Sequence, residues 1–152
     1  MSSKSLLASA TLLVLSAMFA LGADGKPDFT GTWKMDAAKS DFGGPSPSTL
    51  VLTVDHKEPV FKFLVKGTQD GNDFEESGEV TTDGKESTDS MGLLTKAHWE
   101  GNVFVVEFKS QDGSVTGLAH DTLSADGKTY TRDADIKAGD GGHKQHIVLV
   151  KQ

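Results

Sequence analysis

Five histidines are the residues of this chain best suited to hold a metal ion or a haem: His56, His98, His120, His143 and His146. No two of them are four residues apart, the spacing that places two ligands on one helix face. On a strand, His143 and His146 point to opposite faces, while a closed sheet could bring His98, His120 and His146 together. We interpret all five as exposed or singly hydrogen-bonded strand residues, and we expect no metal site.

Catalytic residues do not occur in the patterns that known mechanisms need. The chain has no cysteine, no Gly-x-Ser-x-Gly nucleophile motif and no phosphate-binding loop. Glu75 and Glu76 are adjacent and face opposite ways on a strand, so they do not form a glycosidase pair. Asp133, Asp135 and Asp140 lack the ligand spacing of a calcium-binding hand, which indicates a solvated acidic hairpin. The sequence therefore predicts a protein that is not an enzyme and needs no cofactor.

The charge of the chain excludes one class of partner. Its 152 residues include 22 acids and 15 bases, which gives a formal net charge of −7, and Arg132 is the single arginine. A nucleic-acid-binding protein carries a basic face, so we expect no nucleic-acid partner. A chain of this length forms one domain.

Residues 1–22 have the composition of a signal peptide. Lys4 precedes an apolar run over residues 6–21, and the small residues Ala20 and Gly22 occupy the positions that signal peptidase requires. The run is shorter than the ~20 strongly apolar residues that span a bilayer. We therefore expect cleavage after Gly22, export to the periplasm or the extracellular space, and no integral membrane segment in the mature protein. Residues 23–152 then form a single domain.

The rest of the chain has the pattern of hairpins. Asp-Gly pairs, which favour type I′ turns, occur at residues 70–71, 83–84, 112–113, 126–127 and 140–141. Apolar and polar residues alternate between these turns, as in strands with one buried face. The pattern predicts strands near residues 29–35, 49–56, 59–67, 73–81, 85–91, 93–100, 102–110, 114–123, 128–136 and 143–151, with 36–41 as the only helical candidate. About ten strands joined by hairpins predict an all-β fold, an antiparallel up-and-down β-barrel, because closure removes the exposed edges.

One motif near the start of the mature chain indicates a family. Gly31-Thr32-Trp33-Lys34 places Gly31 and Trp33 on one strand face, where we expect Trp33 to plug one end of the barrel and Gly31 to allow a close approach of a neighbouring chain. The motif resembles the first strand of the calycins, the superfamily of lipocalins and fatty-acid-binding proteins. Residues 33–42 are also similar to short exported bacterial proteins with a lipocalin-like barrel. The resemblance implies a ligand-binding interior.

The chain departs from these families in several places. Residues 36–48 are too short for the helical lid of fatty-acid-binding proteins. Those proteins hold a carboxylate through an Arg-x-Tyr pair on the last strand, whereas residues 143–151 have neither residue. Tyr130 and Arg132 stand one strand earlier in the reversed order. Lipocalins place a late basic residue over the tryptophan, which Arg132 or a C-terminal lysine could do here.

Our main hypothesis is an exported monomer that binds a small apolar or amphipathic molecule inside the barrel. We expect the polar residues Thr95, Thr116 and His120 on interior faces, which favours a partly solvated cavity over a dry core. An anionic head group would meet Arg132, Lys62 or a histidine. The candidate ligand-binding residues are Phe61, Phe63, Phe74, Phe104, Phe108, Tyr130 and Arg132.

Two alternatives belong to other classes of protein. A secreted protein-interaction or inhibitor barrel would have a filled interior and would bind through its loops. A haem- or metal-binding barrel would use the histidines, although the longer Gly-x-Trp-x-Gly-x-Gly signature of haem-binding barrels is absent. A cavity inside the barrel would separate the main hypothesis from the first alternative.

Overall fold

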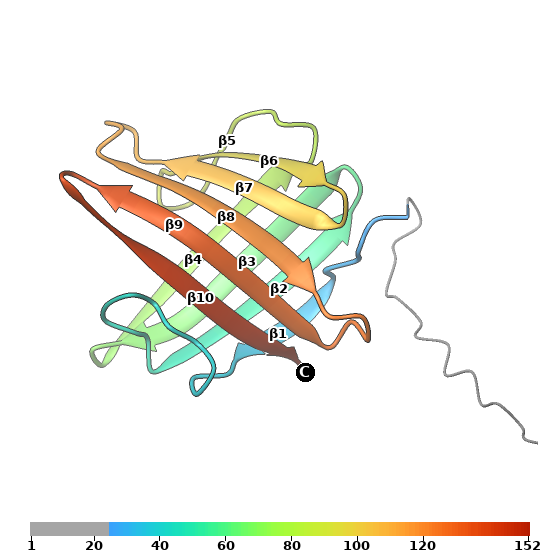
Figure 1. The fold of residues 1–152 in the computed structure, drawn as a ribbon, viewed down its shortest axis with the longest axis horizontal. Helices are drawn as coiled ribbons and strands as arrows, with labels where there is room; N and C mark the ends of the chain where they lie inside the picture. Colours follow the sequence, from blue (N-terminus) through green and yellow to red (C-terminus); the bar gives the residue numbers. More distant parts are fainter. Residues whose placement is uncertain (1–24) are drawn as a thin grey trace, which may run out of the picture.

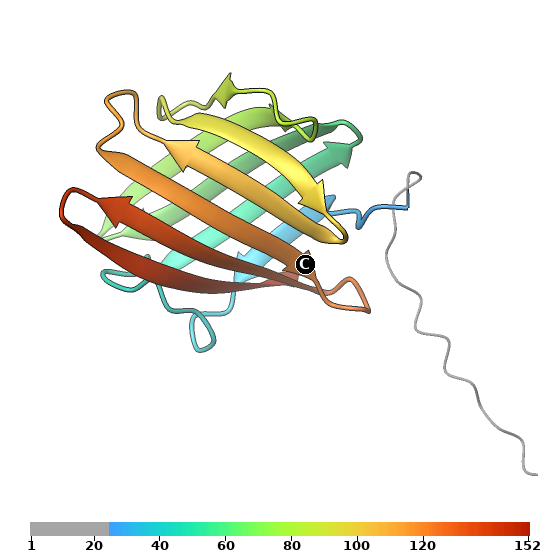
Figure 2. The same cartoon turned by 45° about the horizontal axis from the view of Figure 1, so that its top comes forward.

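Ten antiparallel strands form a nearly closed barrel (Figures 1 and 2). The structure is a computed structural model that describes residues 25–152, so the predicted signal segment lies outside the described residues. The strands are β1 (Gly31–Met35), β2 (Thr49–Lys57), β3 (Val60–Gln69), β4 (Asn72–Thr81), β5 (Ser87–Thr88), β6 (Leu94–Glu100), β7 (Val103–Lys109), β8 (Val115–Leu123), β9 (Thr129–Ala138) and β10 (Gly141–Lys151). Their order around the sheet is β4-β3-β2-β1-β10-β9-β8-β7-β6-β5, which confirms the predicted up-and-down barrel. Among residues 25–152 we find no helix long and apolar enough to cross a membrane.

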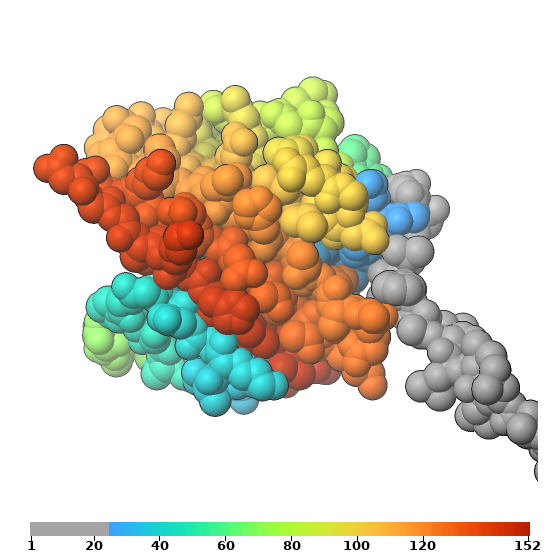
Figure 3. Space-filling model, viewed as in Figure 1, coloured from blue at the N-terminus to red at the C-terminus, as the bar shows by residue number. Residues whose placement is uncertain are grey.

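Two predicted elements differ from the structure. The strand expected over residues 85–91 is reduced to the two residues of β5, because the Asp89 side chain accepts the N–H groups of Met91 and Leu93 and turns the chain there. The helix expected over residues 36–41 is wrong. This segment makes one hydrogen-bonded turn and then pairs through Asp41 with β10, so the loop of residues 36–48 lies against β10 (Figure 3).

The hairpin turns use aspartate in two ways. Only at Asp70-Gly71 do both residues have positive φ, 52° and 77°, as a type I′ turn requires. At Asp83, Asp112 and Asp126 the aspartate has the usual negative φ, and its carboxylate accepts the N–H group two residues further on. The hydroxyl groups of Thr81 and Ser110 donate to Asp83 and Asp112, and together with these backbone N–H groups they lower the pKa of each aspartate to about 2. The expectation of type I′ turns at every Asp-Gly pair is therefore too simple.

Trp33 closes one end of the barrel, as predicted from the motif. It has no exposed surface, and its Nε1 donates to the backbone carbonyl of Phe29 at 2.9 Å. Lys151 holds its Nζ 5.3 Å from the centre of the Trp33 ring, so a C-terminal lysine and not Arg132 makes the cation–π contact. A Cβ on Gly31 would lie 2.9 Å from Cε of Lys151, which shows that the close neighbour of Gly31 is this side chain.

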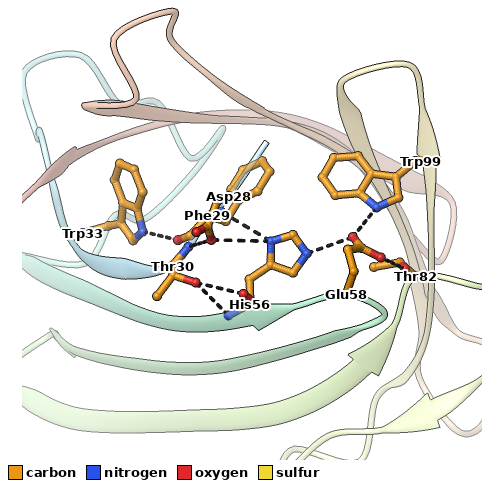
Figure 4. Close-up of polar contacts among 8 residues, drawn as sticks. All are labelled: Asp28, Phe29, Thr30, Trp33, His56, Glu58, Thr82 and Trp99. Atoms are coloured by element: carbon orange, nitrogen blue, oxygen red, sulfur yellow. Dashed lines mark hydrogen bonds and ion pairs between the residues drawn. The ribbon is translucent and has the colours of Figure 1, made fainter. Parts of the chain in front are cut away.

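A polar network around His56 ties the strands together at the same end (Figure 4). The N–H of Phe29 donates to Nδ1 of His56 at 3.4 Å, so we assign the ring proton to Nε2, which donates to Oε1 of Glu58 at 2.9 Å. Trp99 Nε1 donates to the same oxygen at 2.7 Å, and Thr82 Oγ1 donates to Oε2 at 2.5 Å. Glu58 thus links the β2–β3 turn to the end of β4 and to β6, across the side of the barrel where β4 and β6 share no ladder.

We expect Glu58→Gln to lower the free energy of unfolding by about 1–3 kcal/mol at neutral pH, because three donors lose a charged acceptor. Burial would raise the pKa of Glu58, but the hydrogen bonds from Thr82, His56 and Trp99 outweigh it and hold this pKa below the ordinary value of 4.5. A carboxyl group whose pKa is lower in the folded than in the unfolded state stabilises the folded protein at pH values above its unfolded-state pKa. This stabilisation is lost as the pH falls through the folded-state pKa. The difference between the wild type and the variant should therefore shrink below about pH 4.5.

Urea unfolding at pH 7 and at pH 3.5 measures this difference. Glu79→Gln is the control, because Glu79 is exposed and pairs only with Lys62, at 3.5 Å, on the outer surface. The control should change the free energy of unfolding by less than about 1 kcal/mol. A stability difference for Glu58→Gln that stays constant or grows on acidification contradicts the network.

Candidate functional site

The barrel encloses a cavity of about 240 Å³. Strand alternation turns one face of β2, β3, β4, β6, β7, β9 and β10 towards it, and most of its wall is apolar. The lining residues are Leu50, Leu52, Phe61, Phe63, Val65, Glu76, Val80, Asp89, Leu93, Thr95, Phe104, Val106, Phe108, Tyr130, Arg132, Ile147 and Leu149. An apolar cavity with a few polar groups is the usual form of a small-molecule site, so this cavity is the candidate functional site.

Three phenylalanine rings of the barrel each lie over a glycine directly opposite on the neighbouring strand: Phe74 over Gly67, Phe63 over Gly78 and Phe108 over Gly117. Two of them, Phe63 and Phe108, line the cavity. A Cβ on Gly67 would lie 2.6 Å from the Phe74 ring, and one on Gly78 would lie 2.7 Å from the Phe63 ring. At Gly117 the overlap with Phe108 is closer still. Because glycine has no side chain, each ring packs directly on the backbone of the neighbouring strand and does not extend into the lumen. This packing keeps the cavity open.

Arg132 is the basic residue of the cavity wall. Asp121 on β8 and Arg132 on β9 are cross-strand partners, so both side chains point inward. Arg132 donates from Nε to Oδ1 of Asp121 at 2.8 Å and from Nη2 to Oδ2 at 2.9 Å. The Tyr130 hydroxyl donates to the same Oδ2 at 2.6 Å. Asp121 has no exposed surface, so its charge is balanced by these three hydrogen bonds.

The buried carboxylate of Asp121 keeps Arg132 charged and Tyr130 protonated. Burial alone would lower the pKa of Arg132, but the adjacent charge of Asp121 outweighs it and raises that pKa above the ordinary value. Burial raises the pKa of Tyr130 well above its usual range, and the charge of Asp121 raises it further. Arg132 is therefore charged and Tyr130 protonated at physiological pH, so the hydrogen bonds keep one arrangement.

Two further carboxyl groups, those of Glu76 and Asp89, also line the cavity. Glu76 lies on β4, and Asp89 lies in the segment between β5 and β6. Oδ1 of Asp89 accepts the backbone N–H groups of Met91 at 2.9 Å and Leu93 at 2.8 Å, which holds this side chain in place. Burial raises the pKa of Glu76, and the nearby charge of Asp89 raises it further. The cavity therefore has an acidic pole where β4 meets the β5–β6 segment.

Six of the seven predicted ligand-binding residues line the cavity. They are Phe61, Phe63, Phe104, Phe108, Tyr130 and Arg132, and their contact with a ligand stays a prediction. Phe74 is not among the lining residues, although its ring packs over Gly67 as the Phe63 and Phe108 rings pack over their glycines. The Tyr130 ring packs edge-on against Phe29 at 5.0 Å and against Trp33 at 5.6 Å, so it joins the cavity to the closed end.

Two interior placements were predicted wrongly, and two further candidate features lie outside the cavity. Thr116 and His120 are exposed, because even-numbered residues of β8 point outward, whereas Thr95 does face the interior. Lys62 is also on the outer surface, where it pairs with Glu79. The sheet does not bring His98, His120 and His146 into one cluster, and no group of three potential metal ligands occurs among residues 25–152.

Sequence reasoning missed Asp121, Glu76 and Asp89. A signal for Asp121 was present, because it alternates with the apolar residues Ala119 and Leu123 and therefore places a carboxylate on an inward face. For Glu76, the sequence suggested only a catalytic carboxylate pair with Glu75, not a place in the wall of a cavity. The position of Asp89 depends on the turn that shortens β5, which the alternation of residues does not predict.

A second hollow, of about 410 Å³, lies on the outer surface of β6–β9. Leu94, Phe108 and Leu118 contribute apolar area to it, and three of its charged groups pair with one another, since Glu86 is 3.8 Å from Lys96 and 3.7 Å from Lys109. Exposed ion pairs of this length contribute little to binding. The internal cavity, which is lined by buried and pre-positioned groups, is the better candidate.

We expect Gly117→Ala to lower the free energy of unfolding by about 1–3 kcal/mol, because the new methyl group occupies the place of the Phe108 ring. Gly141→Ala on β10 is the matched control, since its Cβ would have its nearest neighbour at 3.9 Å. Chemical denaturation of both variants measures the difference. Equal stabilities would show that the contact between Phe108 and Gly117 does not constrain the wall.

Comparison with known proteins supports the fold. No protein-family model matches the sequence, and no curated protein matches it significantly. The structure is similar to fatty-acid-binding protein 1 of Echinococcus granulosus, with a TM-score of 0.54 and 15% identity over 81% of this chain and 96% of that one. It is also similar to secretory abundant heat soluble protein 4 of Ramazzottius varieornatus, with a TM-score of 0.52 and 12% identity over 82% of this chain and 94% of that one. The chain therefore has a ten-stranded barrel of the fatty-acid-binding-protein type.

Proposed function

We propose that this protein binds a small apolar or amphipathic molecule inside its barrel. The observation that carries the proposal is the cavity of about 240 Å³, which has an apolar wall and a polar cluster held in one arrangement. A cavity of about 150 Å³ accepts benzene, so a cavity of this size suits a ligand of roughly ten non-hydrogen atoms. Each methylene group removed from water contributes about 0.8 kcal/mol to binding.

The barrel fold supports this proposal in general terms. One of the similar structures is a fatty-acid-binding protein by name. The alternative of a protein-interaction barrel required a filled interior, which does not fit a cavity of this size. A fatty-acid ligand is not carried over, because the last strand, β10, lacks the Arg-x-Tyr pair by which fatty-acid-binding proteins hold a carboxylate.

We also propose that residues 1–22 are a signal peptide and that the mature protein acts as an exported monomer. The support is the sequence pattern of Lys4, the apolar run and the cleavage residues Ala20 and Gly22. Expression of the full chain in a bacterium, followed by fractionation and intact-mass measurement, tests this. We expect a periplasmic or secreted protein that begins at Ala23 and sediments as a monomer; a full-length cytoplasmic product would contradict export.

A ring added to the cavity wall should abolish ligand uptake. We expect Val65→Phe, which extends a lining residue into the cavity, to weaken the binding of indole at least tenfold, because the new ring occupies the ligand's volume. Val150→Phe is the control, since Val150 is 39% exposed and lies on the outer face of β10. Ligand-observed NMR titration measures both affinities. Saturable binding that is equal in the two variants would place the site outside the cavity, and no binding by the wild type would overturn the proposed function.

A further inference from the structure

We propose that the cavity selects a small amphipathic cation, a protonated amine on an apolar body, and discriminates against carboxylates. This inference rests on the proposed function and specifies its ligand class. It follows from three features of the described residues: the occupied Arg132–Tyr130 pair, the charge balance of the cavity, and the acceptors at its acidic pole.

The pair of residues that would bind a carboxylate is already occupied. Arg132 and Tyr130 both donate to the carboxylate of Asp121, which is fully buried between them. A carboxylate that bound both of these donors would have to displace Asp121 and leave a buried charge unpaired, which is strongly unfavourable. Of the three guanidinium nitrogens of Arg132, only Nη1 has no protein partner among residues 25–152. It offers a hydrogen bond, but the positive charge of Arg132 is already balanced by Asp121.

The charge balance of the cavity is negative. Arg132 is its one base, because no lysine or histidine is among the lining residues of the described chain. Asp121 balances that charge, and Glu76 and Asp89 remain. Even if Glu76 is protonated, one negative charge is left without a cation. In a cavity of low effective dielectric constant, a ligand with one positive charge neutralises it, whereas an anion adds to the repulsion.

The acidic pole offers hydrogen-bond acceptors for an ammonium group. Thr95 is a second and independent observation, because it is 6% exposed, lines the cavity and makes no side-chain hydrogen bond within residues 25–152. Every fully buried side-chain polar atom of these residues has a partner, so the Thr95 hydroxyl is not fully buried and is open to the cavity. An ammonium group has three N–H donors, which match Glu76, Asp89 and the Thr95 hydroxyl. Phe63 and Asp89 both lie against Gly78, so an aromatic ring flanks the pole and can add a cation–π contact.

Three ligands with the same chain length test this selectivity: octylamine, 1-octanol and octanoate. We expect the purified protein at pH 7.5 to bind octylamine at least about tenfold more tightly than octanol, and octanoate most weakly, as measured by calorimetry. If octanoate binds most tightly, or if octylamine binds no better than octanol, the inference is overturned and the proposed function stands. If none of the three binds, the proposed function itself fails.

A matched pair of variants locates the effect at the acidic pole. Glu76→Gln keeps the shape of the side chain and replaces the carboxyl group at the acidic pole by a neutral amide, while Glu75→Gln makes the same change at a residue that pairs with Lys66 on the outer surface. We expect Glu76→Gln to weaken octylamine binding at least fivefold and to leave octanol binding unchanged. Glu75→Gln should change neither affinity. Equal effects of the two variants on octylamine would show that general surface charge, and not the cavity, attracts the amine.

The occupied pair is tested by removing the charge of Asp121. Asp121→Asn leaves the charge of Arg132 unbalanced, so octanoate binding should strengthen and octylamine binding should weaken. Asp133→Asn makes the same change on the outer face of β9, where Asp133 pairs with His146 at 2.6 Å, and should alter neither affinity. No gain of octanoate binding by a folded Asp121→Asn variant contradicts the role given to Asp121. If that variant does not fold, the wild-type series and Glu76→Gln still decide the inference.

Discussion

The buried carboxylate of Asp121 is the interaction on which the interior of this barrel depends. It accepts the hydrogen bonds of Arg132 and Tyr130, two residues that the sequence offers as candidate ligand-binding residues. Through the Tyr130 ring, which packs on Phe29 and Trp33, the same carboxylate joins the cavity to the closed end. Removing one partner of a buried pair costs about 3–5 kcal/mol, because the remaining charge is left unpaired. Stability and ligand preference are therefore coupled at one residue.

The cavity exists because glycines lie opposite the large aromatic side chains of the wall. Phe63 and Phe108 pack over Gly78 and Gly117, so their rings cover backbone and leave the lumen free. At the closed end, Glu58 receives hydrogen bonds from three strand ends and holds the barrel together where no ladder joins β4 to β6. The polar residues of the interior thus have two separate tasks. Those at the closed end stabilise the fold, and those around the cavity set its charge.

Most of the fold could be predicted from the sequence, and the polar interior could not. Alternation and turn residues predict the strands and their order, because both signals are local. The short β5 was missed because Asp89 turns the chain with its own side chain, which overrides the alternation. Phe61 and Arg132 were correctly assigned to the interior, but the partner of Arg132 lies eleven residues earlier on another strand. Only the cross-strand register shows that Asp121 already occupies the guanidinium.

Arg132 is the single arginine of the chain, so its side-chain NMR signals are unambiguous, and they give the most direct test of this account. If Asp121 holds the guanidinium on two sides, the Nε–H of Arg132 exchanges slowly with water, the Nη groups give separate signals, and saturating acetate or octanoate does not shift them. Averaged Nη signals, or a shift that saturates with added carboxylate, would show that the guanidinium is free to bind an anion and would contradict the account.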